Sequence, residues 1–331
     1  MINHRLRKTI NIVSPLILGG AILYWMYRDF SWATVEDTLL HKMNWWWMLA
    51  SFPFGILAQM FRGWRWKQAL EPLGERPRTS TALYSIFISY AASLVVPRIG
   101  EFTRCGILSK YEGTSFSKAL GTVVTERAVD SLIVLLVTAL VFLCQLPVFI
   151  SFFNKTGTRL DEFFGMFSTT GYIVTFLCAF MAFMSLYIFR KKLASLARGS
   201  GYGKVKSTLK GIYAGIMSLR NVSNIPLFIF YSLAIWVSYF LHYYLTFFCF
   251  AETSVLGLTC AAVTFIVGSI AVLVPTPNGA GSWHFAVKTM LILYGVADPA
   301  ALLFVLIVHS VQTMLVVLLG IYGALALNIK K

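Results

Sequence analysis

Residues 81–104 read TALYSIFISYAASLVVPRIGEFTR, an apolar run followed at once by a helix break and three charged side chains. The run 81–96 has only 16 residues, whereas a helix needs about 20 apolar residues to cross a bilayer. Basic segments flank it at 62–78 and 98–118, and such segments collect on the cytoplasmic side. We therefore expect the run to enter the membrane, break at Pro97-Arg98-Ile99-Gly100 and return to the side from which it came.

The rest of the chain consists mainly of longer apolar runs. Of its 331 residues, 58% are hydrophobic and 12% are charged, whereas a soluble domain has roughly 45–50% and about 25%. These runs predict an all-α polytopic membrane protein, with residues 1–331 forming a single integral membrane domain. The six expected crossings lie at 10–27, 45–61, 119–146, 169–189, 224–250 and 300–327.

A second broken run follows in the C-terminal half. The run 256–274 ends at Pro275-Thr276-Pro277-Asn278-Gly279-Ala280-Gly281, and an apolar segment resumes at 283–295. The loops around this pair, 251–255 and 296–299, contain no basic residues. We expect a second re-entrant helical hairpin that enters from the side opposite to the first.

Six crossings and two hairpins predict an inverted repeat, with pseudo-repeats at 1–165 and 166–331. Each half would contain three crossings, so the second half would begin on the opposite side of the membrane. Many secondary transporters place a binding site at the midplane in this way. When the second half of the sequence is aligned with the first at one constant offset, Gly113 aligns with Gly295, Arg127 with His309 and Asp130 with Gln312.

The formal charge of +15 fits basic cytoplasmic loops better than nucleic-acid binding, and we expect no nucleic-acid partner. The positive-inside pattern predicts an inner-membrane protein with both termini in the cytoplasm. Five scattered cysteines form no CxxC pair, and no P-loop, HExxH or GxSxG motif is present. We therefore expect no metal site, no cofactor and no enzymatic activity.

The first candidate site is the break at Pro97 and Gly100, with Arg98, Glu101 and Arg104 beside it. A guanidinium group offers a bidentate fork to a phosphate or carboxylate. A charge at membrane depth is costly, so it usually faces a cavity and has a partner. Glu101 is a candidate partner for Arg98 or Arg104 when no ligand is bound. The alternative is that these arginines are topology anchors at the cytoplasmic interface.

The second candidate site is Glu126-Arg127 and Asp130, near the start of the predicted crossing 119–146. Arg127 and Asp130 are three residues apart, so they share a helical face and can pair. Two interpretations remain open: a ligand site next to the first cluster, or a structural ion pair that holds this crossing against the hairpin.

The third candidate site follows the second break, where His284 and Lys288 share a helical face and His309 lies in the last predicted crossing. A histidine there could titrate near neutral pH, as a proton-coupled step requires. The alternative is hydrogen-bonded packing. The residues expected to break this hairpin are Pro275, Pro277, Gly279 and Gly281.

The chain resembles the lysylphosphatidylglycerol synthase transmembrane-region family, also called the flippase-like domain family. The same domain forms the N-terminal part of the multiple peptide resistance factor. The resemblance covers nearly the whole chain and is carried by Pro97-Arg98-Ile99-Gly100-Glu101 with Arg104, by Thr125-Glu126-Arg127 with Asp130, and by Pro275 to Gly281. It implies a membrane protein that moves lipids, or lipid-linked molecules, between leaflets. Many relatives have Gly at the position of Asn278 and Glu at that of His284.

Together these observations predict a lipid translocase for envelope biogenesis. Its expected partners are membrane lipids, either an anionic phospholipid or a polyprenyl-phosphate-linked lipid. The predicted headgroup ligands are Arg98, Arg104 and Arg127, with Glu101, Glu126 and Asp130 as their partners. One rival is an integral-membrane transferase that uses a lipid-linked donor and a carboxylate base. Another is a non-catalytic partner in an envelope-biogenesis complex.

Overall fold

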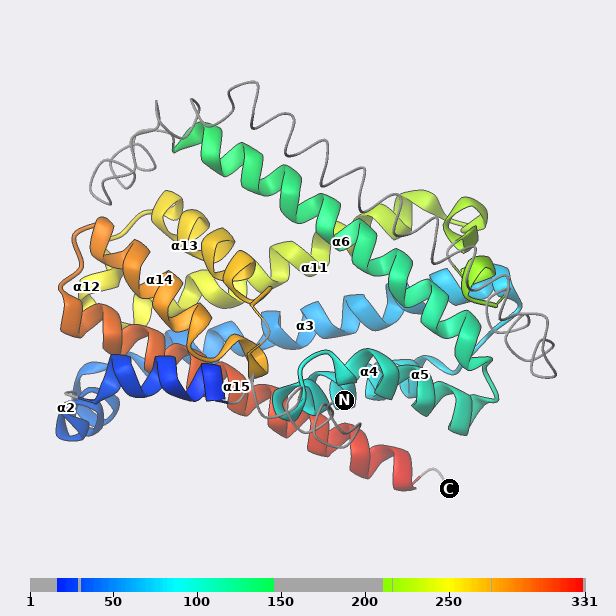
Figure 1. The fold of residues 1–331 in the computed structure, drawn as a ribbon, viewed down its shortest axis with the longest axis horizontal. Coiled ribbons are helices and arrows are strands. Elements are labelled where there is room, and N and C mark those ends of the chain that lie inside the picture. Colours follow the sequence, from blue (N-terminus) through cyan, green and yellow to red (C-terminus); the bar gives the residue numbers. More distant parts are fainter. Residues whose placement is uncertain (1–16, 29–30, 146–210, 216, 275, 330–331) are drawn as a thin grey trace, which may run out of the picture.

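The computed structural model describes residues 17–28, 31–145, 211–215, 217–274 and 276–329. Within these ranges every regular element is a helix, as the sequence predicts (Figure 1). The predicted crossing 169–189, the boundary between the two pseudo-repeats, Pro275 and the basic residues at both ends of the chain lie outside the described residues.

Three helices are long and apolar enough to cross a membrane. They are α6 (Phe116–Cys144), α11 (Ile225–Tyr244), which continues into the 3-10 helix η4 (Leu245–Cys249), and α15 (Asp298–Ile329). Their lipid-compatible length and composition confirm an all-α membrane protein. The first predicted crossing appears as a helix over Ile17–Tyr27.

Helix α3 (Trp45–Leu70) has 26 residues and continues well beyond the predicted crossing 45–61. The side chain of Asn44 caps its first turn by accepting a hydrogen bond from the Trp46 N–H. The helix ends where η2 (Glu71–Leu73) leads into Gly74, which has a φ of 76°. The segment 62–78 is therefore not a basic loop throughout, because Arg62 and Arg65 lie inside α3.

The first broken run forms a helical hairpin. Helix α4 (Thr79–Val95) packs against α5 (Ile99–Glu112), and Arg98 in the short link has a left-handed φ of 63°. The two helices approach so closely that a Cβ on Gly100 would overlap the carbonyl oxygen of Ser89. Glycine at position 100 thus permits the tight packing of this hairpin.

The second broken run forms a matching hairpin of α13 (Leu258–Ala271) and α14 (Ser282–Leu293). Between them lies a 3-10 turn, η5 (Pro277–Gly279). Asn278, Gly279 and Gly281 all have positive φ values, of 52°, 72° and 84°. The Pro- and Gly-rich stretch therefore breaks the helix where the sequence predicts.

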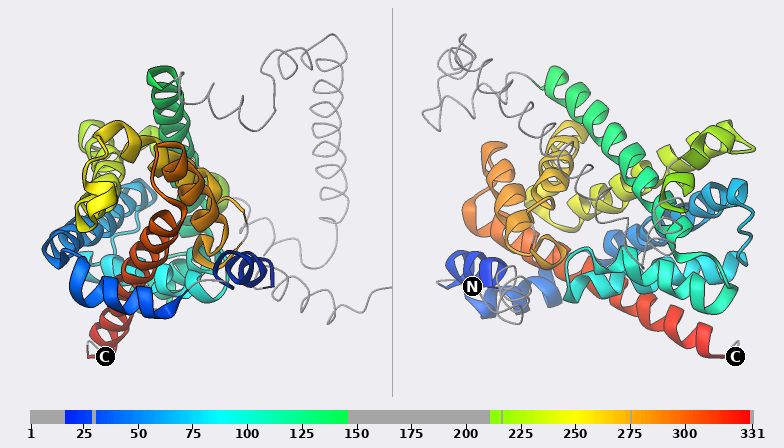
Figure 2. Two further views of the ribbon diagram at one scale, coloured as in Figure 1. Left: turned by 90° about the vertical axis from the view of Figure 1, so that its left-hand side faces the viewer. Right: turned by 45° about the vertical axis from the view of Figure 1, so that its right-hand side comes forward.

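The two hairpins point toward each other. Figure 1 shows α13 and α14 opening toward one end of the long axis and α4 and α5 toward the other, with their breaks near the centre. Helix α15 packs on both α4 and α14 and crosses the whole molecule, as the two views in Figure 2 show. This opposed arrangement suits an inverted repeat, which stays a prediction because the boundary between the halves is not described.

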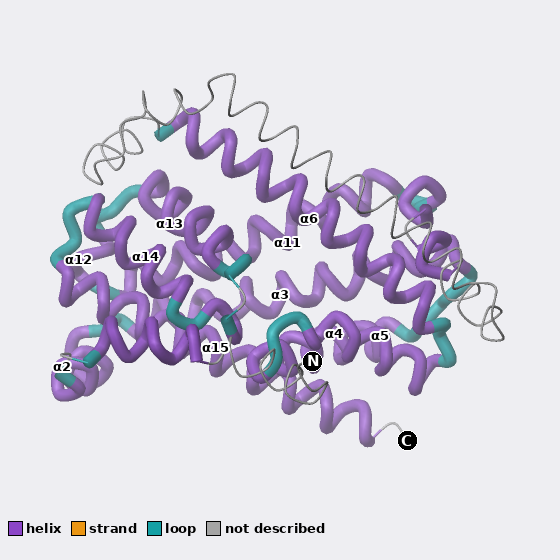
Figure 3. The backbone as a smooth tube through the Cα atoms, in the orientation of Figure 1, coloured by secondary structure: helices purple, strands orange, loops and turns teal. Residues whose placement is uncertain are grey.

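Helix α3 packs along α11 and completes the frame around the hairpin breaks. The main apolar core lies where α11 and η4 meet α14 and α15, around Tyr243, Phe247 and Phe304. Short links join the paired helices (Figure 3). The remaining described helical turns are α2 (Trp32–Asp37), the π-helix η1 (Thr38–Lys42), residues 211–215, η3 (Ser218–Asn221) and α12 (Ala251–Ser254).

Candidate functional site

A buried ion network joins α3 to α6. Arg62 Nη1 lies 2.7 Å from Asp130 Oδ2, and Arg65 Nη1 lies 2.8 Å from Asp130 Oδ1. Arg65 Nε also lies 3.3 Å from Glu126 Oε1. All four side chains are buried. Arg62 and Arg65 belong to the basic segment 62–78, which is expected from the sequence to be a loop, and neither is a predicted site residue.

Helix α5 joins the same network through Arg104. Its Nη1 lies 2.8 Å from Glu126 Oε2, and its guanidinium carbon lies 4.5 Å from the centre of the Trp66 ring. The Trp66 indole N–H donates a hydrogen bond of 2.9 Å to Thr122 Oγ1 on α6. Ion pairs, a cation–π contact and a hydrogen bond therefore hold the three helices together.

The ion network is accessible to solvent at Arg127 and Glu101. Arg127 Nη2 lies 3.6 Å from Asp130 Oδ2, the pair that the three-residue spacing predicts, and Arg127 Nε lies 3.4 Å from Glu101 Oε1. Their side chains are 42% and 35% exposed, in contrast to the buried pairs. Among the described residues Glu101 pairs with Arg127, not with Arg98 or Arg104.

Burial divides the predicted site residues into two groups. Arg104, Glu126 and Asp130 are enclosed by the contacts that fasten the helices together. Removing one member of a buried ion pair is strongly destabilising, so these contacts stabilise the packing of the three helices. Arg98, Glu101 and Arg127 remain available to a ligand.

A cavity of about 240 Å³ lies between the two hairpin breaks. Residues from the first break and from the second break line it together, which brings the two Pro- and Gly-containing motifs into one site. Its positively charged lining is formed by Arg62, Arg98, Arg104 and Arg127, and Glu101 is the carboxylate on its wall. Arg98 is exposed, and no described carboxylate lies within ion-pair distance of it.

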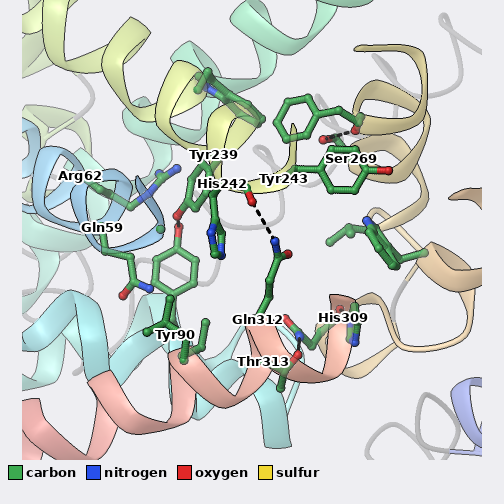
Figure 4. Close-up of a pocket in the computed structure, with 18 of the residues that line it drawn as sticks. Gln59, Arg62, Tyr90, Tyr239, His242, Tyr243, Ser269, His309, Gln312 and Thr313 are labelled. Atoms are coloured by element: carbon green, nitrogen blue, oxygen red, sulfur yellow. Dashed lines mark hydrogen bonds between the residues drawn. The ribbon is translucent and has the colours of Figure 1, made fainter. Parts of the chain in front are cut away.

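A larger cavity of about 350 Å³ adjoins the first (Figure 4). Arg62, Tyr90, Arg127, Val272 and Asn278 line both cavities. At this boundary the hydroxyl of Tyr239 donates a hydrogen bond of 2.9 Å to the hydroxyl of Tyr90. The two cavities are therefore neighbouring compartments of one site at the centre of the molecule.

The predicted histidines lie at the far side of the second break. His284 is buried, and its ring centre is 4.4 Å from that of His309. His309 Nε2 is 3.1 Å from the carbonyl oxygen of Asn278, and Gln312 Nε2 donates to the carbonyl oxygen of His242 at 3.2 Å. His309 lines the larger cavity, whereas His284 packs behind it. Lys288 pairs with Asp298 at 2.8 Å, away from both cavities.

The described residues contain no cluster of three histidine, cysteine or acidic side chains placed to hold a metal ion. The two cavities contain instead the groups that bind polar or anionic organic ligands: guanidinium groups, amides, hydroxyls and aromatic rings. The arrangement is that of a binding site between two broken helical hairpins.

The chain matches a protein-family model over most of its length. Neither the curated proteins nor the solved structures include one that matches the chain. A family model described as the lysylphosphatidylglycerol synthase TM region matches residues 11–320, which include both hairpins and every residue of the two cavities. This family indicates a lipid-related role in the membrane. The chain belongs to the lysylphosphatidylglycerol synthase TM region family.

Proposed function

We propose that this protein moves a lipid with an anionic phosphate headgroup between the leaflets of the membrane. The observation that carries the proposal is the arginine-lined cavity between the two hairpin breaks. A phosphate there would meet Arg98 and Arg127 at the accessible edge of the ion network. A phospholipid such as phosphatidylglycerol and a polyprenyl-phosphate-linked lipid both carry this group.

The charge balance of the site supports an anionic ligand. Five arginines (Arg62, Arg65, Arg98, Arg104 and Arg127) face three carboxylates (Glu101, Glu126 and Asp130), an excess of two positive charges. An uncompensated charge inside a membrane protein is costly unless it meets a partner or water. A phospholipid phosphodiester, with one negative charge, would offset half of this excess, and a polyprenyl phosphate monoester, with a charge of about −1.5 to −2, would offset most or all of it. Helix α5 also begins beside the cavity, with the positive end of its dipole toward the ligand.

The opposed hairpins suggest how access would change. Each break joins two short helices through residues with left-handed backbone conformations, Arg98 in one and Asn278 in the other. Movement of either hairpin would open the cavity toward one side of the membrane. A lipid that binds one of the two hairpin arrangements more tightly would shift the equilibrium between them. The shift cannot exceed the difference between its binding free energies for the two arrangements.

The positive-inside pattern supports an inner-membrane location with cytoplasmic termini as part of this proposal. Within it, Arg98, Glu101 and Arg127 contact the headgroup. Arg104, Glu126 and Asp130 hold the site in shape. The histidines His284 and His309 support the second hairpin break at the wall of the larger cavity.

The test is leaflet exchange in liposomes that contain the purified protein, with labelled phosphatidylglycerol and a labelled short polyprenyl phosphate as probes. Hydrogen bonds to charged groups contribute about 1.5–3 kcal/mol, so we expect Arg98→Ala to slow exchange about tenfold or more. Arg78→Ala is the matched control, because Arg78 is an exposed arginine that pairs with Glu112 at the base of the same hairpin. Its exchange rate should equal that of the unmodified protein.

Three other outcomes would contradict the proposal. Exchange that is absent for both probes in well-folded protein would exclude translocation of these lipids. A probe recovered with altered mass would indicate a transferase. Exchange that Arg98→Ala and Arg78→Ala affect equally would exclude the arginine-lined cavity from the mechanism.

A further inference from the structure

The larger cavity has a different chemical character from the arginine-lined one. Apart from two histidines, its charged lining residues among those described are Arg62 and Arg127, both at the boundary with the smaller cavity. Beyond that boundary the wall combines amides, hydroxyls and aromatic rings with the aliphatic side chains of Leu315 and Val316 (Figure 4). Its polar residues include Gln59, Tyr239, Ser269, Asn278, Gln312 and Thr313.

The buried polar atoms on this wall that lack a hydrogen-bond partner among the described residues include Oε1 of Gln59, an acceptor, Nε1 of Trp236, a donor, and the hydroxyl of Tyr243. Gln59 is only 3% exposed. Leaving a buried polar group unpaired costs free energy, and native structures rarely do so without a ligand, ion or water in the same place. An acceptor and a donor on residues that line one cavity match a group that carries hydroxyls.

Helix α3 places this wall next to the phosphate site. Gly55, Gln59 and Arg62 are spaced so that they share one face of the helix, and all three line the larger cavity. Gln59 lies three residues before Arg62, about 4.5 Å along the helix axis. Arg127 lines both cavities beside Arg62, so a phosphate bound at Arg127 would place its substituent at the boundary that leads to Gln59.

We propose that the larger cavity binds an uncharged, hydroxyl-rich group attached to the lipid phosphate, such as a glycerol or a hexose. This inference rests on the proposed function and names its class of substrate. The flat rings of Trp236 and Trp283 offer apolar faces, and the amides offer paired donors and acceptors, a combination that suits polyols.

The same wall disfavours a cationic headgroup. A buried ammonium group is stabilised best by a carboxylate partner, and the described lining of the larger cavity contains none, whereas Arg62 and Arg127 at its boundary repel a cation. Glu101 lines only the smaller cavity and is already paired with Arg127. An aminoacylated lipid is therefore a poor ligand for this chain.

The experiment compares lipids of equal charge. Binding of phosphatidylglycerol and of phosphatidylpropanol, which lacks the two hydroxyls, is measured on the purified protein in detergent by native mass spectrometry. We expect the unmodified protein to prefer phosphatidylglycerol by at least about fivefold, the value of one or two net hydrogen bonds. Lysyl-phosphatidylglycerol should bind more weakly than phosphatidylglycerol.

Two glutamine variants locate the effect. Gln59→Leu should lower the affinity for phosphatidylglycerol about fivefold and leave that for phosphatidylpropanol unchanged. Gln68→Leu is the matched control, because Gln68 also lies on α3 and has an unpaired buried Oε1 but lines neither cavity. Gln59→Leu should not lower the unfolding temperature, since it removes an unpaired buried acceptor.

The results separate this inference from the proposed function. Equal affinities for the two lipids, preferred binding of the lysyl lipid, or equal effects of both glutamine variants would overturn the headgroup assignment even if leaflet exchange occurs. A preference for phosphatidylglycerol that Gln59→Leu abolishes would support the assignment even if no exchange is detected. In that case only translocation would be refuted.

Discussion

The sharpest prediction concerns the buried ion network. Glu126 is 1% exposed and pairs with Arg104 at 2.8 Å and Arg65 at 3.3 Å. In Glu126→Gln, Arg65 keeps Asp130 at 2.8 Å, whereas Arg104 loses its one carboxylate partner among the described residues. Leaving one buried charge unpaired costs about 3–5 kcal/mol. We therefore expect Glu126→Gln to destabilise the protein severely, although it preserves the size of the side chain.

The second half of this prediction is a double-mutant cycle with Arg104→Met. When Arg104 is already replaced by Met, position 104 carries no charge. Glu126→Gln then leaves no unpaired charge at that position. The double variant should therefore be more stable than Glu126→Gln alone, with a coupling energy of about 2–3 kcal/mol. Met also fills the space against Trp66, which Arg104 contacts in the native structure.

The assay is thermal unfolding of the four proteins in lipid nanodiscs at neutral pH. Domains of about 150–250 residues lose roughly 2–4 °C in unfolding temperature per kcal/mol. Glu126→Gln should thus unfold roughly 6–20 °C below the unmodified protein at these values. Additive effects of the two substitutions, with a double variant less stable than either single variant, would refute a directly coupled pair.

Three further predictions test other parts of the structure. Gly100→Ala should lower the unfolding temperature because its Cβ would overlap the Ser89 carbonyl, at a cost of about 1–3 kcal/mol or more. The control is Gly106→Ala on the same helix, where nothing lies within 4 Å of the new Cβ, and its free energy of unfolding should rise by about 0.5–1 kcal/mol. Arg98→Gly should raise the free energy of unfolding, since the left-handed φ of 63° costs a non-glycine residue about 1 kcal/mol. Its rate of lipid exchange should nevertheless fall as in Arg98→Ala. A stable variant with full exchange would exclude Arg98 from the site. In a protein without native cysteines, impermeant reagents should label Arg76→Cys and Lys110→Cys from one side and Glu252→Cys from the other; labelling of the first two from opposite sides would exclude a re-entrant first hairpin.

The helices and the two hairpin breaks could be predicted because their signals are local. Run length separates α4 from a crossing helix, and Pro97 and the 275–281 stretch mark the breaks. The ion partners of α6 could be predicted in part, since acidic residues in an apolar helix require cations. The spacing of Arg127 and Asp130 identifies their pair.

The contribution of α3 could not be predicted from run length. Counting apolar residues ends a helix at its first arginine, and this rule stops α3 at residue 61. The helical pattern in fact continues until Pro72 and Gly74, and Arg62 and Arg65 are three residues apart on one face. Helix termination signals would have revealed this extension. The larger cavity depends on contacts between distant segments, such as Tyr90 with Tyr239, which one sequence does not contain.

The position of the arginines in α3 has a consequence for membrane insertion. Arg62 and Arg65 meet carboxylates that lie 68 and 61 residues later in the chain. At about 5–20 residues per second, a ribosome needs roughly 3–14 s to synthesise the intervening segment. Each unpaired arginine at the centre of a helix opposes insertion by about 2.5–3.5 kcal/mol. We therefore expect the end of α3 to remain at the membrane surface until α6 has been synthesised, and the two helices to enter the bilayer as a neutralised pair.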